Sequence, residues 1–67
     1  MKREDCKRFM GIKVKLVLKT AVSYQYTGYI KEVREDSILF RDKFNQLIPI
    51  DISSIAVINP INNGGDL

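Results

Sequence analysis

The chain has 67 residues, of which 45% are hydrophobic, and it carries a formal net charge of +3. This composition indicates one globular domain rather than a disordered chain, and no apolar run approaches the roughly 20 residues of a membrane-spanning helix. So small a core usually needs additional stabilisation. With one cysteine and no histidine, the chain can form neither an internal disulfide nor a common zinc site, so self-association is the remaining source of stability.

The excess positive charge lies at the N-terminus. Residues 1–13 contain five basic and two acidic side chains, whereas residues 14–67 contain six of each and are neutral. A local basic patch attracts polyanions, and an assembly of several copies would multiply it. The alternative is a solvated terminal helix without a partner. The same segment lacks the apolar stretch of a signal peptide, so a cytoplasmic protein is expected.

The first predicted element is a short helix over residues 2–10. Cys6, Phe9 and Met10 share one face of it, and Gly11 is expected to cap its C-terminal end. From residue 12 the hydrophobic period changes to two, which predicts a strand over residues 12–19. The expected core face of this strand consists of Ile12, Val14, Leu16 and Leu18.

A long second strand is predicted over residues 22–33. Tyr24 and Tyr26 are expected to lie on its core face, and Tyr29 on the opposite face. Gly28 falls on the core face in mid-strand, where a glycine permits a sharp bend or a close backbone approach.

Three shorter strands follow, over residues 37–42, 46–50 and 55–59. Pro49 cannot donate a ladder hydrogen bond, so that position is expected at an exposed edge. Between the last two strands, residues 51–54 predict one tight 3₁₀ turn, with the Asp51 side chain as its cap. Residues 60–67 have turn residues and no periodicity, and they are expected to form a disordered tail.

In this order the elements predict a mainly β domain over residues 1–59, a five-stranded, strongly bent small barrel with a short N-terminal α-helix. The stretch YTGYIKEVREDSILFRDKFNQLIPID, residues 26–51, resembles the Sm-like superfamily, and within it most closely the bacterial RNA-chaperone family Hfq. Gly28 falls on the family's strand-two glycine, and Ser54 on the serine of the family's AIS turn. The resemblance covers roughly residues 2–58.

The resemblance implies a homo-oligomeric ring, usually of six subunits in Hfq and often of seven in other Sm-like proteins. Strand four of one subunit pairs with strand five of the next in such rings. Physical reasoning favours the same arrangement, because an isolated small barrel leaves two apolar edge strands open. The resemblance also implies a chaperone or scaffold that binds single-stranded RNA without chemistry. From the composition, no cofactor, metal or membrane is expected.

The resemblance places the pore loops at Asp36, Pro49, Ile50 and Asp51. Hfq has Tyr-Lys-His at the last three positions, so the stacking aromatic, the cation and the imidazole are replaced here. The remaining candidate RNA-binding residues form a basic rim and an outer face: Lys2, Arg3, Lys7, Arg8, Tyr29, Lys31 and Arg34.

Enzymes and protein-interaction modules are the other functional classes to consider for a chain of this size. An enzyme is not expected, because the chain has no histidine, glycine-rich phosphate loop or metal-ligand cluster, and Cys6 lies on the apolar helix face. The alternative to RNA binding is a small barrel that acts as a protein-interaction or assembly module, and the altered pore positions favour it. DNA binding by the same barrel is a weaker option.

Overall fold

The computed structural model describes residues 1–61, apart from the side chain of Val22, and contains one short helix and five strands. The elements are α1 (Arg3–Arg8), β1 (Lys13–Leu18), β2 (Ala21–Val33), β3 (Ser37–Asp42), β4 (Leu47–Asp51), the 3₁₀ turn η1 (Ile52–Ser54) and β5 (Ile55–Pro60). The expected mainly β fold with an N-terminal helix is therefore present. Pro60 belongs to β5 rather than to a tail, and the rest of the expected tail, from residue 62, lies outside the described residues.

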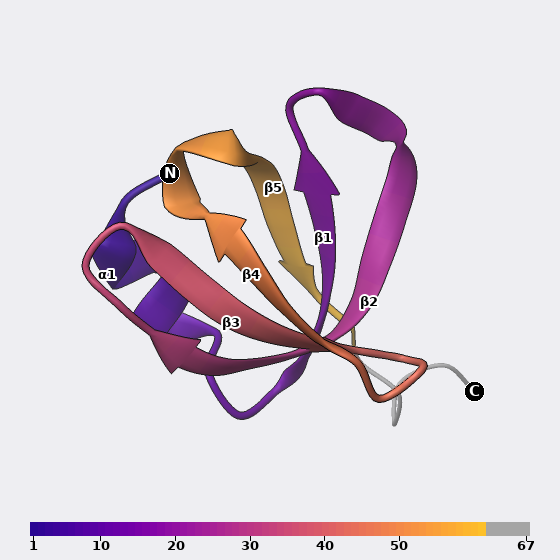
Figure 1. The fold of residues 1–67 in the computed structure, drawn as a ribbon, viewed down its shortest axis with the longest axis horizontal. Coiled ribbons are helices and arrows are strands. Elements are labelled where there is room, and N and C mark those ends of the chain that lie inside the picture. Colours follow the sequence, from indigo (N-terminus) through magenta and orange to yellow (C-terminus); the bar gives the residue numbers. More distant parts are fainter. Residues whose placement is uncertain (62–67) are drawn as a thin grey trace.

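All five strands form one antiparallel sheet in the order β4-β3-β2-β1-β5. The length of β2 makes this order possible, because its first part pairs with β1 and its last part with β3. Figure 1 shows β2 curving from one side of the molecule to the other, with the β3–β4 hairpin projecting away from α1. β4 and β5 are the two edges, and the ladders within residues 1–61 do not join them.

The core lies on the concave face of this sheet. It consists of Cys6, Val14, Leu16, Ile30, Ile38, Phe40, Ile50, Ile52, Ile55 and Ile58, and Leu18 and Tyr26 pack against it. Two residues expected on the core faces of the first two strands lie outside it. Ile12 precedes β1 and is 43% exposed, and Tyr24 is 50% exposed. The β1–β2 register shifts after Val17, so the two-residue alternation of β2 does not extend back to Tyr24.

Gly28 marks the closest approach of β2 and β3. A Cβ atom at this position would overlap the carbonyl oxygen of Arg41, so a side chain cannot be accommodated without moving the strands. The expected role of Gly28 in a close backbone approach is therefore confirmed.

Helix α1 covers one end of the sheet and contributes Cys6 to the core. It is shorter than expected, because the chain leaves the helix after Arg8 and Phe9 is the C-cap. Gly11 has a left-handed φ of 84° in the turn that leads to β1, so it shapes this turn rather than the cap. Met10, expected on the buried helix face, is 42% exposed.

The segment from β4 to β5 is two strands joined by one tight turn, as expected. The Asp51 side chain makes no capping hydrogen bond, which corrects the expected role of this residue. Backbone bonds hold the turn instead. Ile52 N donates to Asp36 O over 2.9 Å, and Lys19 N donates to Ser54 O over 2.8 Å.

Both edge strands carry a proline on the side that faces away from the sheet. In β4 the backbone groups of even-numbered residues bond to β3, as the Asp42 N–Gln46 O and Ile52 N–Asp36 O bonds show. The backbone nitrogen of Pro49, an odd-numbered residue, therefore faces away from β3. Ile61 N donates to Lys13 O over 2.9 Å, so Pro60 faces outward from β5 by the same alternation. Each proline removes one donor from an open edge at no cost to the sheet itself.

Candidate nucleic-acid interface

Three side chains of the outer sheet face stand in one row across three strands. Tyr29 in β2 is the register partner of Lys13 in β1 on one side and of Arg41 in β3 on the other. Their chain neighbours Val14, Ile30 and Phe40 point into the core, so the three residues of the row point away from it. Directly opposite residues on one face have Cβ atoms about 5 Å apart. An aromatic ring, 40% exposed, is thus flanked by two cations.

A hollow of about 290 Å³ adjoins this row. Its lining comes from the start of β1, the middle of β2 and the β3–β4 turn: Lys13, Thr27, Gly28, Tyr29, Arg41, Asp42, Lys43 and Asn45. Three cations against one carboxylate leave this lining with a net charge of +2. None of its three cations forms an ion pair with any residue in the range 1–61. The hollow is therefore a positively charged, partly aromatic depression.

Arg41 is held in place by packing rather than by a carboxylate. Its Nε atom is buried and finds no hydrogen-bond acceptor among the described residues. A buried donor without an acceptor costs about 1–3 kcal/mol, which is an unfavourable state for a guanidinium group. Because Arg41 also lines the hollow, its guanidinium charge would attract an anion there.

The β3–β4 turn beside the hollow is well ordered by its own hydrogen bonds. Asp42 Oδ1 accepts from Phe44 N and from Gln46 N, each over 2.9 Å, and Asn45 N donates to Asp42 O over 3.0 Å. Asn45 has φ 67°, a conformation that asparagine tolerates better than most residues. These bonds present Phe44 to solvent, 67% exposed, with Lys43 Nζ 5.5 Å from its ring centroid.

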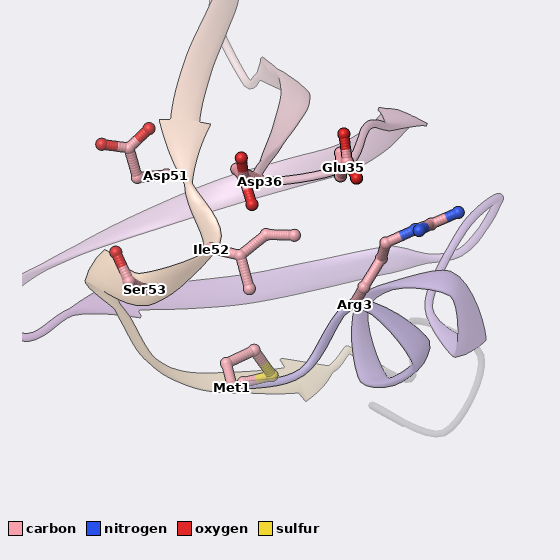
Figure 2. A pocket seen from close by; sticks show the side chains of 7 residues that line it. All are labelled: Met1, Arg3, Glu35, Asp36, Asp51, Ile52 and Ser53. Atoms are coloured by element: carbon pink, nitrogen blue, oxygen red, sulfur yellow. The ribbon is translucent and has the colours of Figure 1, made fainter.

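A second hollow, of about 480 Å³, lies at the end of the sheet covered by α1 and has the opposite charge. Figure 2 shows the carboxylates of Glu35, Asp36 and Asp51 on one side of it, with Met1 and Arg3 on the other. Within the described part of the chain Arg3 forms no ion pair with these carboxylates. Phosphate groups are repelled from such a surface. The two hollows lie at opposite ends of β3, roughly 17 Å apart by strand geometry.

The sequence-predicted residues other than Tyr29 lie in four environments: the exposed surface, the acidic hollow, the edge of β4 and the core. Lys2, Lys7, Arg8 and Lys31 are exposed, without ion pairs among the described residues, whereas Arg34 Nε pairs with Glu32 Oε2 over 3.2 Å. Arg3 lines the acidic hollow together with Asp36 and Asp51. Pro49 lies on the exposed edge of β4. Ile50, expected at a pore loop, is a core residue with 6% exposure, because it pairs with Ile38 on the buried face.

Sequence reasoning identified Tyr29 but missed its neighbours Lys13, Arg41, Lys43 and Phe44. The alternation of β1 does place Lys13 on the outer face, and the alternation of β3 does the same for Arg41. Only the strand register brings both residues beside Tyr29, and register depends on tertiary structure.

The remaining nucleophile and metal candidates lack a supporting environment. Burial raises the pKa of the Cys6 thiol, and the negative charge of Asp5 raises it further. A raised pKa disfavours the thiolate, the reactive form of cysteine. No cluster of potential metal ligands occurs within the described residues. In the same part of the chain, no helix is both long enough and apolar enough to cross a bilayer.

No protein-family model, curated protein or solved structure was found to match this chain.

Proposed function

We propose that this protein is a Sm-like small β-barrel that assembles through its open edges into a homo-oligomeric ring and binds single-stranded RNA as a non-catalytic chaperone or scaffold in the cytoplasm. The observation that carries the RNA part of the proposal is the in-register row of Lys13, Tyr29 and Arg41 beside a positively charged hollow. Proteins bind single strands by stacking bases on aromatic rings and by placing cations along the phosphates.

The proposed RNA surface differs from the pore that the family resemblance suggests. Asp36 and Asp51 belong to the acidic hollow, where phosphate is repelled, whereas Tyr29 lies toward the basic end of the sheet. The exposed cations of α1 then serve as a second, sequence-independent attraction for the RNA backbone. RNA would accordingly run over the outer face.

Self-association is supported by the two open edges. β4 and β5 each present unpaired backbone groups together with an exposed apolar side chain, Leu47 at 50% exposure and Val57 at 41%. Pairing β4 of one copy with β5 of another would satisfy these groups and enlarge a core that is small for an independent domain. Pro49 and Pro60 restrict the number of registers in which this pairing forms its full set of bonds.

The RNA proposal is tested by fluorescence anisotropy with oligo-A, oligo-U and a structured small RNA at low and physiological salt. Wild-type protein is expected to bind at least one single strand, and Tyr29→Ala is expected to weaken binding by about 1–3 kcal/mol. Lys19→Ala, which removes an exposed cation outside the hollow, is the matched control. Failure of the wild-type protein to bind any of the three RNAs at about 50 mM salt would overturn the proposal.

The assembly proposal is tested by light scattering, with the absorbance ratio at 260 and 280 nm read on the same sample. Leu47→Lys and Val57→Lys place charges on the two edges without touching the core, and each is expected to reduce the mass toward that of the monomer. Met10→Lys adds the same charge at a comparably exposed apolar residue away from the edges. A monomeric wild-type protein at high concentration would contradict a ring.

A protein-interaction module is the second candidate, and the acidic hollow favours it. Glu35, Asp36 and Asp51 line one side of a depression that the apolar residue Ile52 also lines. A basic segment of another protein fits this combination of charges. Recovery of one protein without nucleic acid in a pull-down, combined with thermal stability that RNA leaves unchanged, would favour this candidate over RNA binding.

A further inference from the structure

We infer that the basic hollow and the β3–β4 turn together form a site for two successive nucleotides, with one base on Tyr29, the next base on Phe44 and the phosphodiester between them at Lys13, Arg41 and Lys43. This inference rests on the proposed binding of single-stranded RNA and specifies the unit of RNA that the site takes. It assigns functions to Phe44 and Lys43, which lie in the turn between β3 and β4.

The position of Phe44 is the first support for this site. Lys43 and Asn45, its two chain neighbours, both line the hollow that Tyr29 also lines. Phe44 therefore stands at the rim of the hollow. The residue is 67% exposed, so one face or edge of its ring is accessible to a base.

The rigidity of the turn is the second support. The Asp42 carboxylate accepts from the backbone N–H groups of Phe44 and Gln46, so the residue that carries the ring is fixed at its own amide. An aromatic ring on a fixed backbone loses little conformational entropy when a base stacks on it. Lys43 Nζ lies over the ring, 5.5 Å from its centroid, and adds a cation beside it.

The positive charge of the hollow is the third support. Arg41 and Lys13 flank Tyr29 in the strand register, and neither has an ion-pair partner among residues 1–61. Asp42 also lines the hollow, but its Oδ1 atom is engaged by two backbone donors, which disperse its charge toward the turn. A phosphate in the hollow meets the three cations that line it, Lys13, Arg41 and Lys43.

The experiment compares adenosine monophosphate, the dinucleotide ApA and a methylphosphonate-linked ApA as ligands, by NMR titration of the full-length protein. Phe44→Ala is expected to weaken the binding of ApA by about 5- to 150-fold and to leave the affinity for adenosine monophosphate unchanged. Tyr29→Ala is expected to weaken the binding of both ligands. Arg41→Gln is expected to weaken the binding of ApA. It is expected not to change the affinity for the methylphosphonate-linked ApA, because that linkage carries no charge. Phe44→Trp, which keeps a stacking ring, retains the wild-type preference for ApA.

The controls separate this inference from the proposed function. If Tyr29→Ala weakens RNA binding but Phe44→Ala leaves ApA affinity unchanged, the two-nucleotide site is wrong and RNA binding stands. If wild-type protein binds no single strand, both are wrong. If Phe44→Ala lowers the oligomeric mass without altering ApA affinity, Phe44 is a contact between copies and the inference is overturned. Because Phe44 is mostly exposed, Phe44→Ala is expected to fold normally, which circular dichroism checks.

Discussion

Gly28 and Arg41 lie so close across β2 and β3 that a single Cβ atom on the glycine would overlap the carbonyl oxygen of the arginine. The same two strands carry Tyr29 and the Arg41 side chain on the outer face. The close approach of the backbones is therefore a structural condition for the row on which the proposed RNA site depends.

Gly28→Ala is expected to destabilise the protein by about 3 kcal/mol, because the strands must separate to admit the methyl group. Urea unfolding monitored by circular dichroism gives the change in unfolding free energy. Gly11→Ala is the matched control. Gly11 has no atom within 4 Å of an added Cβ, so only its left-handed φ of 84° is penalised, by about 1 kcal/mol. Equal losses in the two variants would contradict the close approach.

Removing the carboxylate of Asp42 is expected to loosen the β3–β4 turn. Asp42→Ala deprives Phe44 N and Gln46 N of their acceptor, at a cost of about 1 kcal/mol in unfolding free energy. Hydrogen exchange at these two amides is expected to accelerate. Asp42→Asn retains an acceptor oxygen and is expected to keep most of the protection. Unchanged exchange in Asp42→Ala would show that the turn is held by other contacts.

Stability is expected to fall in mildly alkaline solution because of Cys6. Burial, assisted by Asp5, raises the pKa of its thiol in the folded state above the ordinary value of 9.0. At a pH below that value the Cys6 thiol is protonated in both the folded and the unfolded state, so its contribution to the free energy of unfolding is fully present. As pH rises from 9.0 toward the raised folded pKa, the unfolded chain loses the proton first, so unfolding becomes more favourable.

Urea unfolding from pH 7 to pH 10 measures this dependence on Cys6. Cys6→Ala cannot titrate at this position, so it is expected to show a shallower alkaline loss than the wild-type protein, although it is less stable throughout because a buried group is removed. Parallel pH profiles for the two proteins would show that the thiol is not protected in the folded state. Slow reaction of the native thiol with a disulfide reagent is the companion observation.

The acidic hollow is expected to oppose RNA binding without supporting the fold. Asp36→Asn and Asp51→Asn remove exposed charges that make no capping bond or ion pair in the described residues, so stability is expected to change by less than about 0.5 kcal/mol. RNA affinity is expected to rise by about twofold at low ionic strength and by less at physiological salt. Glu32→Gln, which breaks the ion pair with Arg34, is a control that frees a cation elsewhere. A fall in affinity for the Asp variants would place RNA at the acidic end.

The sequence by itself determined the order and type of the elements. Alternation of apolar residues located the strands, and the break at Pro49 and Asp51 correctly predicted two strands with a 3₁₀ turn between them. Gly28 was recognisable because a glycine in mid-strand weakens the strand and is typical of a bend or a close backbone approach. These are local properties, so they can be read from neighbouring residues.

The tertiary structure decided which residues meet. Lys13, Tyr29 and Arg41 come from three strands, and their row exists only in the observed register, which no local pattern encodes. The shift after Val17 likewise moved Tyr24 out of the core against its alternation, and the hairpin ladder placed Ile50 inside rather than at a pore. Register follows from the summed packing of the whole sheet, and for that reason the site became visible only when the strands were assembled.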